Sequence, residues 1–142
     1  MAIAQVDARE DIITQLETIP GVDVYRGQYL TDGAVPQMTE DGLFPPYITI
    51  VFGASYAGYS RGIVSERLNT LRTTVTVYVV SPSDSITLDF IDQVNDKMLG
   101  FVPTDGTELK AYGGYDYVDA DLGVNRYVHS LVFTYQTNMS TP

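Results

Sequence analysis

The chain has 142 residues, a formal net charge of −10 and no cysteine. That length suits one domain of ordinary size. The lack of cysteine excludes disulfides, thiol nucleophiles and Cys-ligated metals, and the single histidine excludes a multi-histidine metal site within one chain. Eighteen acidic residues against eight basic ones argue against a surface that grips nucleic acid. A hydrophobic content of 44% predicts a folded protein.

We expect neither a membrane span nor an export signal. The longest nearly apolar runs, such as residues 75–80, are far shorter than the roughly 20 residues that cross a bilayer. Residues 1–10 lack the basic and apolar regions of a signal peptide. The sequence therefore predicts a protein that is made in a cytoplasm and used there, or built into something assembled there.

The first half of the chain predicts a helix and two strands. Asp7 is a predicted N-cap, and Pro20 ends the helix. Residues 22–25 and 47–52 are predicted strands, the second because it is rich in β-branched and aromatic residues. The apolar residues at helical spacing are Ile12, Ile13, Leu16 and Ile19.

Two long connections are predicted within a single domain of residues 1–142. Residues 27–46 contain several turn or breaker dipeptides, and residues 53–69 begin with a run of small residues. Loops of this length in a compact domain are usually functional or partly disordered. The last residues, 138–142, are predicted to fray.

The second half predicts a strand, a helix and two further strands. Residues 71–80 alternate between an apolar and a mixed face. Ser81 is a predicted N-cap, and Gly100 is typical of a helix C-terminus. Residues 108–112 and 127–135 are predicted strands. The predicted apolar stripe of the helix is Ile86, Phe90, Val94 and Met98, widened by Ile91 and Leu99.

This order of elements predicts an α+β fold. Runs of consecutive strands, rather than strict alternation with helices, favour a mainly antiparallel β-sheet. We therefore expect one domain with two helices packed on one face of that sheet.

The sequence offers little that predicts catalysis. It lacks a phosphate-binding glycine loop and a nucleophile elbow. The spacing of His129 on a predicted strand favours a hydrogen-bonded residue on a packed face over a catalytic base. Asp116, Asp119 and Asp121 lack calcium-loop spacing and predict a solvated acidic loop. We expect no enzyme activity, cofactor or metal; a small α+β enzyme or ligand-binding domain using His129 is the alternative.

Tyrosine and arginine residues instead indicate an interface. Tyrosine buries a large ring while keeping a polar tip, and the chain has 11 of them. Arg61 and Arg67 flank a predicted loop, from which they can reach carboxylates on a neighbouring copy. Core packing of the tyrosines and plain surface solubility of the arginines are the alternatives. The predicted interface residues are Tyr56, Tyr59, Arg61, Arg67, Arg72, Tyr115 and Tyr117.

The order of segments is also informative. After the first helix come a Pro-rich approach to a strand in residues 44–50 and a turn of small residues in 53–58. A strand and a Pro-containing helix start follow in residues 74–98, and the chain closes through 114–117, an acidic stretch and Thr134-Tyr135. In this order the chain resembles, over nearly its whole length, the tail terminator proteins of long-tailed bacteriophages, the lambda-like minor tail protein U group. Residues 27–43 are an insertion relative to the shortest members.

This resemblance implies a structural protein of a virion and no enzyme. It implies a hexameric ring that caps the finished tail tube, ends tube polymerisation and offers a docking surface to the head-side connector. The partners would be further copies of the chain, the tail tube protein and the head–tail connector protein, while genomic DNA only passes through. The protein would be assembled in the host cytoplasm and reside in the tail or neck. Another neck or tail-completion (head–tail joining) protein is the nearest alternative.

Overall fold

The structure is a computed structural model that describes residues 3–26, 44–53, 56–58, 70–104, 106–119 and 126–138. None of the described helices is long and apolar enough to cross a membrane. The elements in chain order are α1 (Ile3–Glu17), β1 (Asp23–Arg26), β2 (Tyr47–Phe52), β3 (Tyr56–Gly58), β4 (Thr70–Ser81), α2 (Asp84–Met98), β5 (Lys110–Asp119) and β6 (Arg126–Asn138).

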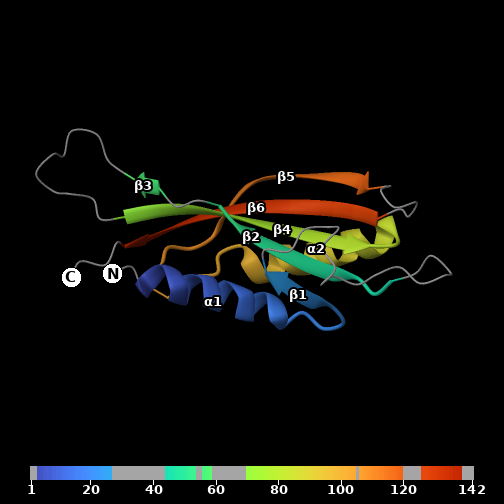
Figure 1. Cartoon of the computed structure of the whole chain (residues 1–142), viewed down its shortest axis with the longest axis horizontal. Helices are drawn as coiled ribbons and strands as arrows, with labels where there is room; N and C mark the ends of the chain where they lie inside the picture. Colours follow the sequence, from blue (N-terminus) through green and yellow to red (C-terminus); the bar gives the residue numbers. More distant parts are fainter. Residues whose placement is uncertain are drawn as a thin grey trace, which may run out of the picture.

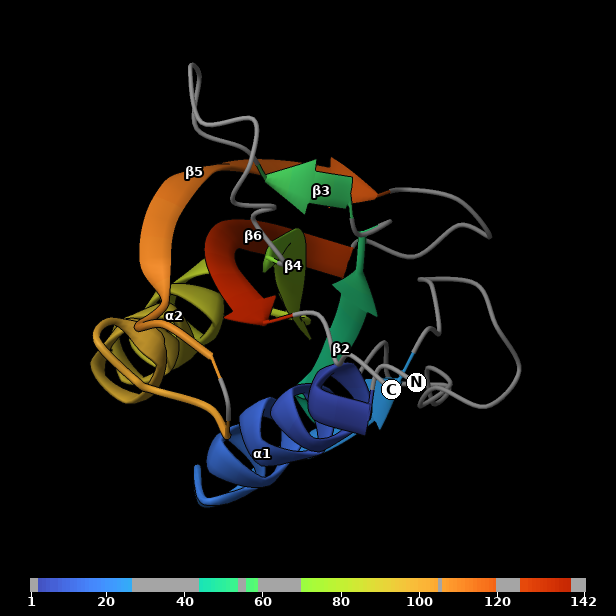
Figure 2. The ribbon, with the colours of Figure 1, turned by 90° about the vertical axis from the view of Figure 1, so that its left-hand side faces the viewer.

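The described strands form one sheet of six, in the order β1-β2-β4-β6-β5, with β3 paired to β4 outside this path. β1 is parallel to β2, and every other pairing is antiparallel. β4 and β6 pair over twelve positions and form the centre of the sheet. Figures 1 and 2 show the long, twisted central strands with α1 and α2 along one side. The predicted α+β fold with a mainly antiparallel sheet is confirmed.

One face of the sheet carries the main hydrophobic core. On β4 the buried residues of this face are Thr73, Val75, Val77 and Val79, as the alternation predicts. The register places Ile48 and Ile50 of β2 beside them on one side and Phe133 of β6 on the other. The buried residues that the two helices add are Ala8, Ile12, Ile13, Leu16, Ile91, Val94 and Met98. Both helices therefore pack on the same face, and each large apolar side chain buried there contributes roughly 1.5–3 kcal/mol.

The buried side of α2 differs from the prediction. Its buried residues are Thr87, Ile91, Val94 and Met98. Ile86 and Leu99, which were predicted to lie in the core, are 39% and 49% exposed. Thr87 takes the inner position because its hydroxyl lies 2.7 Å from the buried Ser81 hydroxyl and donates to the Tyr127 carbonyl. A polar residue with partners can replace an apolar one in a core.

The helix ends differ from the sequence prediction at the N-termini. α1 begins at Ile3, so Asp7 lies within the helix. α2 begins at Asp84 with Ser83 as its N-cap, two residues later than the predicted N-cap Ser81. Gly100 has a φ of 80°, which confirms the left-handed C-terminal residue expected there.

β5 is longer than the predicted strand of residues 108–112, because it runs from Lys110 to Asp119. Asp116 and Asp119 therefore lie on a strand rather than in an acidic loop, and Asp121 lies outside the described residues. The strand continues because it pairs with β6 along its whole length.

A bulge lets β5 run through a glycine pair. The register with β6 shifts between Ala111 and Gly113. Gly113 has a φ of 151°, a conformation that side chains disfavour. A Cβ on Gly114 would collide with the Ser130 carbonyl oxygen. In the sequence, Gly113 and Gly114 indicate a turn, but in the structure they lie at a bulge within β5.

Two further departures concern the predicted loops and tail. β3 lies within the predicted loop 53–69, because Tyr56–Gly58 pair with the first residues of β4. Asn138, predicted to fray, pairs with Thr70 as the last residue of β6. The other predicted loop positions at 27–43, 54–55 and 59–69, and the tail at 139–142, lie outside the described residues.

Candidate functional site

The predicted interface residues are only partly within the described structure. Tyr59, Arg61 and Arg67 lie outside it. The others lie on three strands of the sheet: Tyr56 on β3, Arg72 on β4, and Tyr115 and Tyr117 on β5.

Tyr56 and Arg72 are neighbours across the β3–β4 pairing. Arg72 is exposed, and on its other side it lies opposite Gln136 of β6. A cavity of about 280 Å³ opens beside it. The residues that line this cavity are Arg72, Thr107, Glu108, Lys110, Thr134, Tyr135 and Gln136. This end of the sheet therefore combines two predicted residues with a hollow that holds charges of both signs.

Tyr115 and Tyr117 form a second group. They lie opposite Ser130 and Val128 of β6. Ser130 is six positions along β6 from Gln136, a separation of about 20 Å at the rise of a strand. Figure 1 shows β3 near one end of the long axis and the C-terminal end of β5 toward the other. The predicted set is thus split into two surfaces rather than gathered into one.

His129 lies on the core face of β6, between Val79 of β4 and Asp116 of β5 in the register. It is half-buried, and its Nδ1 has no hydrogen-bond partner among the described residues. No group of three or more potential metal ligands occurs within the described ranges. His129 therefore lies on a packed face, as the sequence predicts, but the predicted hydrogen bond is not seen at Nδ1 among the described residues.

A larger cavity, of about 450 Å³, opens between α1 and the edge of the sheet. We call it the α1–β2 pocket. Its lining residues are Arg9, Glu10 and Ile13 of α1, Arg26 of β1, and Ile50, Val51 and Phe52 of β2. β1 pairs with β2 only as far as Ile50, so Val51 and Phe52 extend past the end of β1. The pocket forms at this step in the sheet edge.

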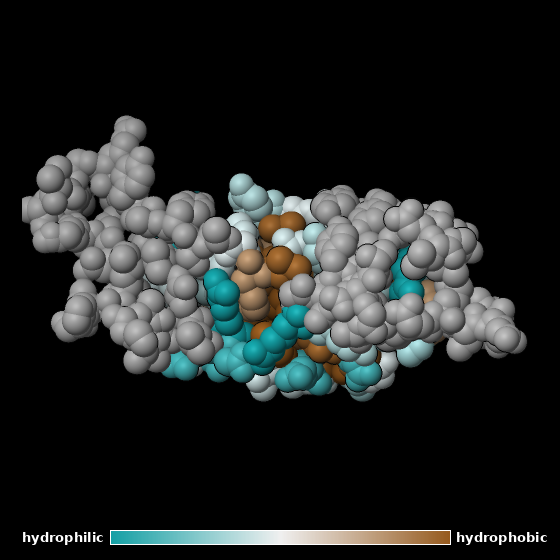
Figure 3. Space-filling model, viewed as in Figure 1, coloured by the Kyte–Doolittle hydropathy of each residue, from teal (hydrophilic) through white to brown (hydrophobic). Residues whose placement is uncertain are grey.

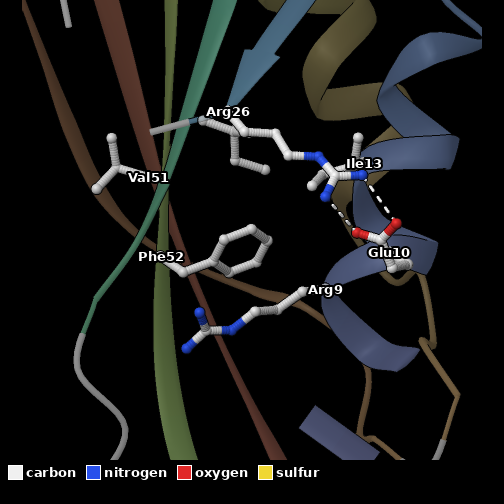
Figure 4. A pocket seen from close by; sticks show the side chains of 7 residues that line it. Arg9, Glu10, Ile13, Arg26, Val51 and Phe52 are labelled. Atoms are coloured by element: carbon white, nitrogen blue, oxygen red, sulfur yellow. Dashed lines mark hydrogen bonds and ion pairs between the residues drawn. The ribbon is translucent and has the colours of Figure 1, made fainter. Parts of the chain in front are cut away.

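An ion pair links the two walls of the α1–β2 pocket. Arg26 reaches from β1 to Glu10 on α1, with N–O distances of 2.6 and 2.8 Å (Figure 4). The hydrogen bond to Glu10 raises the pKa of Arg26 further above its ordinary value. Both side chains are about half exposed, so water and salt screen the pair and its contribution to stability is small.

Arg9 lies deeper in the same pocket. Figure 4 shows it extending from α1 toward the Phe52 ring, and its guanidinium carbon lies 4.9 Å from the ring centroid. Its Nε is buried without a hydrogen-bond partner among the described residues. Burial raises the pKa of nearby Tyr135, and hydrogen bonding with Thr73 and the positive charge of Arg9 partly offset this. Arg9 is therefore a cation held on an aromatic ring without a described carboxylate partner.

The outer side of α2 has the opposite charge. Asp89, Asp92 and Asp96 are exposed there, and Leu88 and Leu99 flank them with 45% and 49% exposure. Among the described residues, no ion pair joins these three carboxylates to a cation. We call this surface the α2 outer face. On another side of the molecule, Figure 3 shows an apolar strip bordered by hydrophilic residues.

The sequence did not identify the α1–β2 pocket. Its residues come from positions 9–13, 26 and 50–52, and no spacing rule connects them. The chain has only eight basic residues, and two of them, Arg9 and Arg26, line this pocket. The scarcity of basic residues was therefore the only sequence signal that could have drawn attention to these two positions.

Comparison with known proteins gives a match in structure. No family model matches the sequence, and no curated protein matches it. The fold is similar to that of a chain in the virion of a native gene transfer agent (GTA) particle, with a TM-score of 0.60 and 14% sequence identity. The similarity covers 95% of this chain and 97% of that one. At this identity the match shows a shared fold over almost the full length of both chains.

Proposed function

We propose that this protein is a structural component of a phage-like virion, and that it forms a hexameric ring which caps the tail tube and ends its polymerisation. The observation that carries the proposal is the fold shared with a GTA virion chain over 95% and 97% of the two lengths. The resemblance in segment order to tail terminators supplies the specific role.

The two separated groups of predicted residues support a capping role. A terminator binds the tube on one side and offers a different surface on the other. In this proposal the end with Tyr56 and Arg72, together with Tyr59, Arg61 and Arg67, contacts the tube. Tyr115 and Tyr117, toward the other end of β5, contact a neighbouring copy or the head–tail connector. Aromatic and arginine side chains are enriched in such contacts.

The net charge of −10 supports a passive relation to DNA. A ring with acidic walls repels the phosphate backbone, so genomic DNA passes through the ring without being held. The proposal therefore includes no enzyme activity and no cofactor. It places the protein in the tail or neck of a virion assembled in the host cytoplasm.

The experiment is deletion of this gene from the element that encodes it, followed by negative-stain imaging of the particles. We expect overlong tubes without heads, because nothing stops tube growth. Headless tails of normal length would instead favour another neck or head–tail joining protein. Complete particles with tails of normal length would contradict a structural role. A wild-type copy supplied in trans is the control.

A further inference from the structure

We propose that the α1–β2 pocket receives the α2 outer face of a second copy of this chain. The proposal rests on the ring proposed above, and it names the two surfaces that join neighbouring copies in that ring.

The pocket requires a partner with both acidic and apolar groups. Glu10 already neutralises Arg26, at N–O distances of 2.6 and 2.8 Å. No described carboxylate neutralises Arg9, and its buried Nε has no described hydrogen-bond partner. Phe52 and Ile13 supply apolar walls next to this cation. A carboxylate that enters beside apolar side chains would satisfy Arg9 and cover Phe52 together.

The α2 outer face matches these requirements. Asp89, Asp92 and Asp96 span about 10 Å along the helix at 1.5 Å per residue. Leu88 and Leu99 flank them and are each nearly half exposed. The face thus presents carboxylates between two apolar side chains, which is the complement of a cation on an aromatic ring.

The positions of the two surfaces suit a ring. Figure 2 shows α2 on one flank of the molecule and β1 and β2 on the opposite flank, with α1 between them. A closed ring requires two different, complementary patches on each copy, because each copy binds its neighbours head to tail. The Gln15 side chain donates to the Lys97 carbonyl at 3.2 Å, which ties the pocket wall on α1 to α2 within one copy.

The test uses neutral variants that remove one side of the junction at a time. Arg9→Gln removes the pocket cation, and Asp89→Asn/Asp92→Asn/Asp96→Asn removes the charge of the α2 outer face. We expect each to raise the dissociation constant for association between copies by about tenfold or more, measured by sedimentation velocity. The wild-type association should also weaken with added salt.

Matched controls change the same charges elsewhere. Lys110→Gln removes a cation beside the other cavity, and Asp7→Asn/Asp23→Asn/Glu108→Gln removes three exposed carboxylates that belong to neither proposed surface. Both controls should associate like the wild type. An equal loss of association in the controls would overturn the proposal, because it would show a general charge effect.

Mixing the two interface variants gives a sharper result. The α2 outer face of Arg9→Gln is intact, and so is the pocket of the triple Asn variant. We therefore expect the mixture to form a one-to-one dimer that grows no further. A mixture that stays monomeric at concentrations where the wild type assembles would overturn the proposal.

Cysteine cross-linking covers the case in which Arg9→Gln fails to fold. The chain has no cysteine of its own. A Glu10→Cys/Asp92→Cys variant places one thiol on the exposed wall of the pocket and one on the α2 outer face, and it should form a ladder of disulfide-linked oligomers on oxidation. Each single variant should stop at dimers. A double variant that yields no ladder would overturn the pocket assignment while leaving the ring intact. A wild-type protein that stays monomeric at every concentration would overturn the ring as well.

Discussion

Arg126 shows how a single charged residue can be structural in this acidic protein. Its side chain is 3% exposed, and its Nη1 donates to the Tyr47 hydroxyl at 2.8 Å. Its guanidinium also lies 4.6 Å from the centre of the Phe44 ring. These residues, with Val80 and Val128, form a small second core on the sheet face opposite the helices. Arg126 therefore both packs against the Phe44 ring and donates a hydrogen bond to Tyr47.

We predict that Arg126→Ala lowers the free energy of unfolding by about 3 kcal/mol, because it removes a buried stack and leaves the Tyr47 hydroxyl without this donor. Urea unfolding followed by circular dichroism measures the change. Arg72→Ala, at an exposed position, is the matched control and should cost less than about 0.5 kcal/mol. An equal decrease in unfolding free energy in the two variants would show that the buried contacts of Arg126 do not stabilise the protein.

Asp11 gives stability a specific dependence on pH. It accepts hydrogen bonds from the backbone amide, at 2.8 Å, and the hydroxyl of Thr104. These bonds lower its pKa below the ordinary value of 3.8. A carboxyl group with a lowered folded-state pKa stabilises the protein above its unfolded pKa and loses this effect as the pH falls through the folded pKa.

We therefore predict that Asp11→Asn is less stable than the wild type at neutral pH, and that the difference shrinks once the pH falls below about 3.8. Urea unfolding at pH 7 and at several values below pH 4 measures both curves. Asp7→Asn, an exposed change on the same helix, is the control. A difference that stays constant down to the lowest pH would contradict the role assigned to the Asp11 carboxylate.

At the scale of elements, hydrophobic spacing predicted which segments form helices and strands more reliably than which side they bury. The stripe of α1 at Ile12, Ile13 and Leu16 is buried as predicted. α2 is rotated about its axis relative to the predicted orientation, because the Thr87 hydroxyl hydrogen-bonds to Ser81 of β4 and to the Tyr127 carbonyl of β6. Such long-range partners leave no mark in the spacing of apolar residues, so the rotation was not predictable.

The two sides of α2 provide a direct comparison. We predict that Ile91→Ala costs about 2–4 kcal/mol of unfolding free energy, because Ile91 is 6% exposed and its loss leaves a cavity. Ile86→Ala, at a 39% exposed position, should cost under about 1 kcal/mol. Urea unfolding of both variants measures the difference. A larger loss for Ile86→Ala would favour the helix orientation predicted from the sequence.

The candidate sites were predictable only in part for a similar reason. Tyr56 and Arg72 were singled out by residue type, and the register makes them neighbours. Arg9, Arg26 and Phe52 are far apart in sequence. They line one pocket only because β1 ends before β2 does. β5 was underestimated because its Gly113-Gly114 bulge has the composition of a turn.

At the scale of the whole molecule, the structure presents different surfaces on different sides. Tyr56 and Arg72 lie at one end of the sheet, and Tyr115 and Tyr117 lie about 20 Å away along the strands. α2 lies on one flank and the strands β1 and β2, which border the α1–β2 pocket, lie on the other (Figure 2). In the proposed ring, the flanks contact neighbouring copies. The two ends of the sheet contact the tube and the connector.

The most direct test of this account measures tube growth. Purified protein is added to tail tubes of the same particle while they elongate from an excess of tube subunits, and tube lengths are read from electron micrographs. The account predicts that elongation stops and that each arrested tube carries a ring of this protein at one end. Tubes that elongate to the same length with and without the protein would contradict it.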